Sequence, residues 1–162
     1  MDTIHMPKMQ GAYLAPNASV VGDVVLEADV NVWYGAVIRG DSGTIRIGAG
    51  TNIQDNCVLH EEVAIGKNCT IGHGAIVHGC TIGDGCLIGM GSIILNGAVL
   101  EDGCLVGAGA LVTGKVHAAA GSLVLGSPAK VIRNLTDEEK AASLADAEHY
   151  IQLAQKQLNL QK

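Results

Sequence analysis

The stretch IGDGCL-IGMGSI-ILNGAV-LEDGCL-VGAGAL, residues 82–111, decides the fold because it divides into five units of six residues. Each unit begins with Ile, Leu or Val. The same spacing continues to Val124. It also covers residues 47–77 and 14–38, where the six-residue count starts anew from Ile47 and from Leu14. Of the 19 positions at this spacing, 18 are Val, Ile or Leu, where chance would give about five. An aliphatic residue at every sixth position is therefore the main regularity of this chain.

This periodicity predicts an all-β solenoid. Each unit supplies one short strand and one tight turn, and three units close one turn of a triangular parallel β-helix. Stacked turns place their strands ~4.8 Å apart, with the aliphatic residues forming ladders inside the prism. Glycine, present 22 times, supplies the positive φ angles that tight turns need. We expect the prism to occupy residues 1–130.

The repeat ends near Val124, and residues 131–162 are predicted to form a linker and one amphipathic helix. Residues 126–130 (GSPAK) break the pattern, and the sequence TDEE from Thr136 is typical of an N-cap with a capping box. Apolar residues then recur at three- and four-residue steps: Leu144, Ala147, Ile151, Ala154 and Leu158. We expect a helix to about Leu160 that packs along the prism.

Composition narrows the possible partners and compartment. The net charge of −6 argues against nucleic acid and anionic membrane surfaces. No apolar run approaches the ~18 residues of a membrane span, and residues 1–5 do not resemble the start of a signal peptide. Five cysteines in such a chain indicate free thiols in a reducing cytoplasm.

Three of the six histidines fall at informative positions of the repeat. We call the aliphatic residue that begins each six-residue unit its anchor. His60 and His78 each directly follow an anchor and lie 18 residues, or one turn, apart. They therefore stack on one edge of the prism. His73 lies on another edge, where only a neighbouring prism could bring it to the first two. The pattern predicts a homotrimer with three intersubunit sites, each holding three imidazoles, an arrangement typical of catalytic zinc.

Polar residues occupy the same two edges one turn earlier. Residues at equivalent positions of successive turns form a column along the prism. Arg39 lies in the column of His60, and Asp55 lies in the column of His73. An Arg39–Asp55 ion pair between subunits follows from the arrangement of the edges. Gln54 is placed to donate a hydrogen bond to a metal-bound water.

Three motifs resemble the γ-class carbonic anhydrase family of hexapeptide-repeat proteins: residues 32–41 (VWYGAVIRGD), 52–60 (NIQDNCVLH) and 71–80 (IGHGAIVHGC). The resemblance implies a left-handed prism and a homotrimer. It also implies Zn²⁺, with Fe²⁺ or Co²⁺ as alternatives, held between subunits by His60, His73 and His78. The implied reaction interconverts CO₂ and bicarbonate through a metal-bound hydroxide.

The resemblance also assigns roles to further residues. Gln54 matches the residue that orients the hydroxide, Arg39 and Asp55 match the intersubunit ion pair, and Tyr150 resembles a tyrosine near the metal. The best-studied members carry a long acidic insertion after the first histidine, whereas here only Glu61 and Glu62 follow His60. The proton shuttle is left open among these two glutamates and the tyrosine.

Two other function classes share this fold: a hexapeptide acyltransferase or coenzyme A thioesterase, and a trimeric structural or assembly subunit. The cysteines also have two interpretations. Four of them lie four residues after an anchor, where the prism needs small inward side chains: Cys57, Cys69, Cys86 and Cys104. We expect core packing there, with a redox switch or second metal as the alternative.

Overall fold

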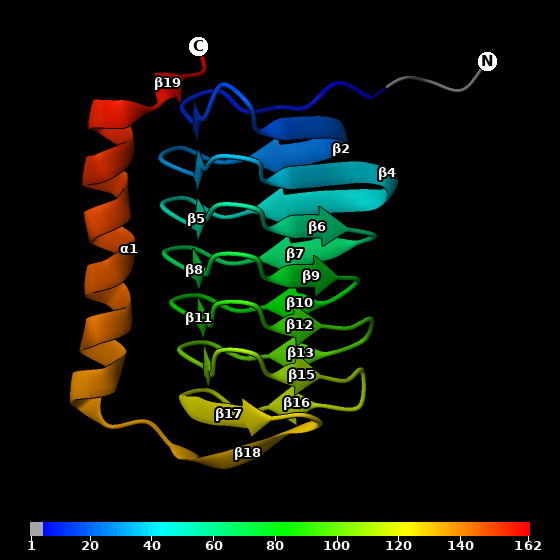
Figure 1. Ribbon diagram of the computed structural model, residues 1–162, viewed down its shortest axis with the longest axis vertical. Coiled ribbons are helices and arrows are strands. Elements are labelled where there is room, and N and C mark those ends of the chain that lie inside the picture. Colours follow the sequence, from blue (N-terminus) through cyan, green and yellow to red (C-terminus); the bar gives the residue numbers. More distant parts are fainter. Residues whose placement is uncertain (1–4) are drawn as a thin grey trace.

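The computed structural model describes residues 5–162 as a parallel β-solenoid of about six turns with one C-terminal helix, α1 (Asp137–Gln157), along its side (Figure 1). The predicted fold class is thus confirmed. Residues 1–4, which belong to the segment tested for a signal peptide, lie outside the described residues. Within the described part of the chain, no helix is both long and apolar enough to cross a membrane.

The prism has three faces. We call the one beneath α1 the helix face; its parallel strands are β1 (Tyr13–Leu14), β3 (Asn31–Val32), β5 (Asn52–Ile53), β8 (Thr70–Ile71), β11 (Leu87–Ile88), β14 (Leu105–Val106) and β17 (Ser122–Gly126). Two antiparallel strands extend its sheet at the ends, β18 (Ala129–Asn134) beside β17 and β19 (Asn159–Leu160) beside β1.

The other two faces share two long strands, β2 (Ser19–Leu26) and β4 (Val37–Ile47), which run across the edge between them. The apolar face continues with β6 (Val58–His60), β9 (Ile76–His78), β12 (Ile93–Ile94) and β15 (Leu111–Val112). The polar face continues with β7 (Val63–Ile65), β10 (Thr81–Ile82), β13 (Val99–Leu100) and β16 (His117–Ala118).

The predicted anchors form the core. Partners one turn apart are in register, as in Ile53 opposite Ile71 and Ile71 opposite Ile88. All anchors from Leu26 to Val124 are buried, whereas Leu14 and Val20, in the first turn, are only partly buried. Because alternate residues of a strand point to opposite sides, the residue before each anchor faces outward.

The first interruption of the repeat, after Ile38, has a structural cause. Between Ile38 and Ile47, strand β4 carries an additional inward residue, Ile45, which pairs with Val63 of β7. This widens the edge between the apolar and polar faces. The chain turns there through Glu61, whose φ of 65° lies in the left-handed region. The widened edge is the one that carries His60.

The C-terminal segment confirms one prediction and corrects three. Thr136 and Glu139 form the predicted capping box. However, residues 131–134, expected in a linker, belong to β18, which pairs with the strand edge left open by the last turn. The helix also ends at Gln157 rather than near Leu160, because β19 follows and pairs with β1. Leu144, expected on the buried stripe, is 50% exposed.

Small residues explain the position of Leu144. The helix packs against β3, β5 and β8, and its buried residues are Ser143, Ala147 and Ala154. Their small size lets the helix approach the sheet closely. Leu144 is therefore displaced to the side, where it lies beside the backbone of Gly85.

Candidate metal centre at two edges of the prism

Two imidazoles meet at the edge between the apolar and polar faces, which we call the second edge. His60 and His78 are partners in the ladder between β6 and β9, as their 18-residue separation predicted. Their ring centroids are 5.2 Å apart, and Nδ1 of His60 lies 3.2 Å from Nε2 of His78. The edge of a tetrahedron with metal–nitrogen bonds of ~2.0–2.1 Å is about 3.3 Å, so this spacing fits two ligands of one zinc ion.

Each imidazole has an inner nitrogen that faces the other ring and an outer nitrogen that faces away from it. The partners of the outer nitrogens decide which nitrogen of each ring carries the proton. Nε2 of His60 lies 2.9 Å from Oδ1 of Asp41, and Nδ1 of His78 contacts Oδ1 of Asn96. Oxygen acceptors at both positions favour a proton on each outer nitrogen. The two inner nitrogens then face each other with lone pairs. Such a pair is stabilised by a cation between the rings, so the donor set fits a divalent metal.

Glu61 adds a carboxylate to this edge. One ligand atom from each of His60, Glu61 and His78 lies within 4.8 Å of the others, and all three residues are partly buried. Asp41 completes the surroundings from the preceding turn. The hydrogen bond with His60 lowers the pKa of the Asp41 carboxyl group, which keeps it an acceptor. Together these groups make the second edge rich in metal-ligating atoms.

His73 lies on a different edge, between the helix face and the apolar face, which we call the first edge. Its Nδ1 is 2.8 Å from Oδ2 of Asp55, one turn earlier. The carboxylate holds Nδ1, so Nε2 is the nitrogen that can bind a metal. As predicted, His73 and the other two histidines do not meet within one chain.

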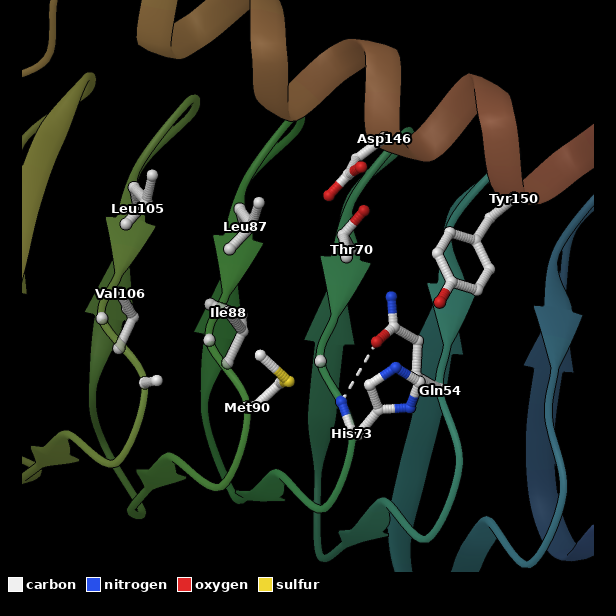
Figure 2. Close-up of a pocket in the computed structure, with 14 residues that line it drawn as sticks. Gln54, Thr70, His73, Leu87, Ile88, Met90, Leu105, Val106, Asp146 and Tyr150 are labelled. Carbon is white, nitrogen blue, oxygen red and sulfur yellow. Dashed lines mark hydrogen bonds between the residues drawn. The ribbon is translucent and has the colours of Figure 1, made fainter.

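Gln54 is fixed by its neighbours beneath α1. Its side chain is buried, and Oε1 accepts a hydrogen bond of 3.1 Å from the backbone N–H of His73 (Figure 2). Its Nε2 donates to Oδ1 of Asn52, which in turn donates to Thr70. With one N–H directed to Asn52, the second N–H of Gln54 is left for another acceptor.

Tyr150 of α1 lies on the same side of the prism (Figure 2). Its ring packs edge-on against Trp33 at a centroid distance of 5.4 Å. Burial, together with the charges of Asp55 and Asp146, raises the pKa of its hydroxyl group. Tyr150 therefore remains a hydrogen-bond donor at neutral pH.

Arg39 and Asp55 do not contact each other within the chain. Arg39 lies in register with His60, as predicted, and its guanidinium is 3.6 Å from Asp41. Asp55 contacts His73 instead. The ion pair between subunits therefore stays a prediction. Sequence reasoning did not assign roles to Asp41 and Asn96.

Comparison with known proteins agrees with the fold. The family described as "Bacterial transferase hexapeptide (six repeats)" matches residues 44–79 and 79–114. A crystal structure of a hexapeptide transferase family protein from Anaplasma phagocytophilum has a TM-score of 0.89 and 44% identity, and the match covers 93% of this chain and 92% of that one. These findings define a hexapeptide-repeat protein.

Two curated relatives narrow the class further. Gamma carbonic anhydrase 1, mitochondrial, of Arabidopsis thaliana is 45% identical over 154 residues, or 89% of this chain and 56% of that protein. Protein YrdA of Escherichia coli is 47% identical over 153 residues, or 88% of this chain and 83% of that protein. The chain belongs to the γ-class carbonic anhydrase-like family of hexapeptide-repeat proteins. It spans little more than half the length of the Arabidopsis relatives.

Proposed function

We propose that this protein interconverts CO₂ and bicarbonate at a divalent metal site formed between two copies of the chain. The observation that carries the proposal is the facing pair of ring nitrogens, 3.2 Å apart, whose outer nitrogens are held by oxygen acceptors. Three imidazoles suit Zn²⁺ and also Fe²⁺ or Co²⁺. The third imidazole, His73, comes from the neighbouring copy in this proposal.

The apolar face supports assembly into a trimer. Its outward residues form a column of aliphatic side chains that are exposed or half-buried: Val37, Val58, Ile76, Ile93 and Leu111. On the polar face the column contains Arg46, Ala64 and Thr81, and α1 lies along the helix face. The apolar face lies between the first and second edges. Burial of this face around a threefold axis would bring the first edge of one copy to the second edge of the next.

The chain's own groups can position the substrate. A bound divalent metal lowers the pKa of a coordinated water toward ~7 and so supplies hydroxide at neutral pH. Gln54 offers its second N–H to the attacking oxygen and so orients it, and the hydroxyl group of Tyr150 is one route for the released proton. Hydration of CO₂ forms one C–O bond to carbon and leaves bicarbonate and a proton. Glu62, exposed beside the second edge, can pass this proton to solvent.

Arg39 and Asp55 have a positioning role in this proposal. In the trimer, the second edge carrying Arg39 meets the first edge carrying Asp55. Asp55 has two carboxylate oxygens and uses Oδ2 for His73. Its remaining oxygen can accept from the partner's guanidinium, which would fix His73 relative to the other two ligands.

The test is the metal content of untagged protein purified without chelator, measured together with CO₂ hydration. We expect about one metal ion per chain and hydration above the buffer rate. His73→Ala should lose both. His117→Ala is the matched control, because His117 is an exposed histidine that pairs with Glu101 on the polar face. A metal-replete, reduced trimer without hydration activity would exclude the proposed reaction.

Acyl transfer or hydrolysis of a coenzyme A thioester is the second candidate. It is favoured by the name of the Anaplasma relative, a hexapeptide transferase family protein. Acetyl coenzyme A turnover by the wild type and by His73→Ala distinguishes the mechanisms. Equal turnover by both proteins would place that chemistry away from the metal site. Residence in a reducing cytoplasm likewise stays a prediction.

A further inference from the structure

A cavity of about 440 Å³ lies between α1 and the helix face, directly beside His73 (Figure 2). Its polar end is formed by Gln54, His73 and Tyr150. Leu87 and Leu105 form the floor farther along the prism, and Met90, which is 58% exposed, lies at its side. One end of the cavity thus belongs to the candidate metal centre, whereas the rest is lined mainly by aliphatic groups.

The cavity arises from a change within one column of the helix face. The outward residues under the closely packed part of α1 are Asn31, Asn52 and Thr70, all buried. The next two in the same column are Leu87 and Leu105, which are only partly buried. The helix makes its main contacts at β3, β5 and β8. The two leucines beyond β8 therefore remain as an apolar floor that the helix does not fully cover.

Neither substrate of the proposed reaction uses this space. The cavity falls in the range of ~300–1,000 Å³ that is typical of sites for larger organic ligands, whereas CO₂ and bicarbonate occupy only its polar end. A ligand that fills the cavity must combine a small polar head with an apolar tail. The head that resembles bicarbonate most closely in shape and charge is a carboxylate.

We propose that the cavity binds an unbranched aliphatic monocarboxylate of roughly eight carbons. Its carboxylate occupies the bicarbonate position at the metal centre, and its alkyl chain lies over Leu87 and Leu105. From the turn of His73 to that of Leu105 is two turns of the prism, or about 10 Å. An extended chain advances about 1.25 Å per carbon–carbon bond, so this distance corresponds to about eight bonds, or a chain of eight to nine carbons.

The charges around the polar end make this binding depend on the metal. Asp55 contacts His73, and Asp146 lines the cavity from α1. Without a cation, these two carboxylates repel an anionic head. With a divalent cation present, the head gains a direct opposite charge. The inference therefore rests on the proposed metal site, and its test separates the two.

The experiment is isothermal titration calorimetry of zinc-loaded and metal-free protein with acetate, butyrate, hexanoate and octanoate. Each buried methylene contributes about 0.8 kcal/mol, which corresponds to about a fourfold gain in affinity. Because the cavity is open on one side, we expect a gain of two- to threefold per methylene in the zinc-loaded protein. Octanoate should bind at least tenfold more tightly than butyrate. The metal-free protein should show no binding.

Substitution of the two floor leucines tests where the alkyl chain of the ligand lies. The double variant Leu87→Thr/Leu105→Thr removes the apolar floor. Thr70 already occupies the same column of the helix face, so threonine at these two positions should preserve the strands. We expect the ratio of octanoate to butyrate affinity to fall toward one. Val99→Thr is the matched control, because Val99 faces outward on the polar face in register with Thr81. It should leave the ratio unchanged.

Each other outcome contradicts a distinct part of the account. Equal affinity for all four acids in zinc-loaded protein would refute the apolar subsite while leaving the metal site intact. Octanoate binding without metal would refute the placement of the head. A protein that takes up no zinc would remove the proposed function itself, and the chain-length inference with it.

Discussion

Asn96 is predicted to control metal affinity without binding the metal. Its Oδ1 contacts Nδ1 of His78 and thereby holds the proton on that nitrogen, leaving Nε2 as the ligand. In Asn96→Ala the imidazole can rotate, and the proton can move to the nitrogen that must bind the metal. The variant should therefore bind Zn²⁺ more weakly than the wild type while its fold is preserved, because Asn96 is exposed and lies outside the aliphatic core.

The magnitude follows from the surroundings of each histidine. Loss of an outer hydrogen-bond partner typically costs 10- to 100-fold in metal affinity. Water can replace the amide at the exposed position of Asn96, so we expect about tenfold, or about 1.4 kcal/mol. Asp41→Ala should cost more, toward 100-fold, because it removes a charged acceptor from His60, whose side chain is only 16% exposed.

The assay is competition for Zn²⁺ against a chromophoric chelator, with melting temperatures measured in parallel. Asn134→Ala serves as the control, since Asn134 is an exposed residue of β18. The expected order of affinity is wild type and control first, then Asn96→Ala, then Asp41→Ala. An Asn96→Ala protein within twofold of the wild type would refute the role given to the outer hydrogen bond.

Three further predictions concern the cysteines, the helix cap and the assembly. All five thiols are buried, so native protein at pH 7.5 should react only slowly with Ellman's reagent, and rapid reaction would contradict the packing role. Burial raises the pKa of the Cys57 thiol to about 11, whereas the hydrogen bond with Cys86 lowers the pKa of the Cys104 thiol to about 7, so Cys104 should react before Cys57. Arg133 lowers the pKa of Glu139 to about 2, so this carboxylate stabilises the fold above its ordinary pKa of 4.5 and progressively less as the pH falls toward 2. The difference in melting temperature between wild type and Glu139→Gln should shrink from pH 5 to pH 3, and a constant difference would refute the ion pair. Ile76→Glu should convert the proposed trimer to monomer in light scattering, whereas Ala64→Glu on the polar face should not; an intact trimer in both would exclude the apolar face as the interface.

The fold and the meeting of two candidate ligands could be predicted because a solenoid converts sequence spacing directly into spatial neighbours. His60 and His78 meet for the same reason that Leu59 and Val77 do: each pair is one turn apart. The rule weakens where the repeat changes length. Asn96 follows its anchor, Ile94, by two residues rather than one, and because Ile94 pairs with Val77, Asn96 lies one position beyond the partner of His78. The contact between Asn96 and His78 was therefore not expected.

Features that depend on packing between distant elements could not be predicted from the sequence. Helical spacing alone cannot tell whether Ser143 or Leu144 faces the prism, because they are adjacent on the helix and only the close approach of α1 selects the smaller one. Strand β18 forms because the last turn leaves an open edge. The cavity over Leu87 likewise exists only because the helix packs most closely on other strands.

The central claim, a metal centre shared between copies, is tested most directly by subunit complementation. His73→Ala and the double variant His60→Ala/His78→Ala should each assemble without bound metal. When the two are unfolded together, refolded in equal amounts and supplied with Zn²⁺, each mixed trimer should regain one complete interface, so metal content should reach about one quarter of the wild-type value. Full metal content in His73→Ala alone, or none in the mixed trimers, would contradict the account.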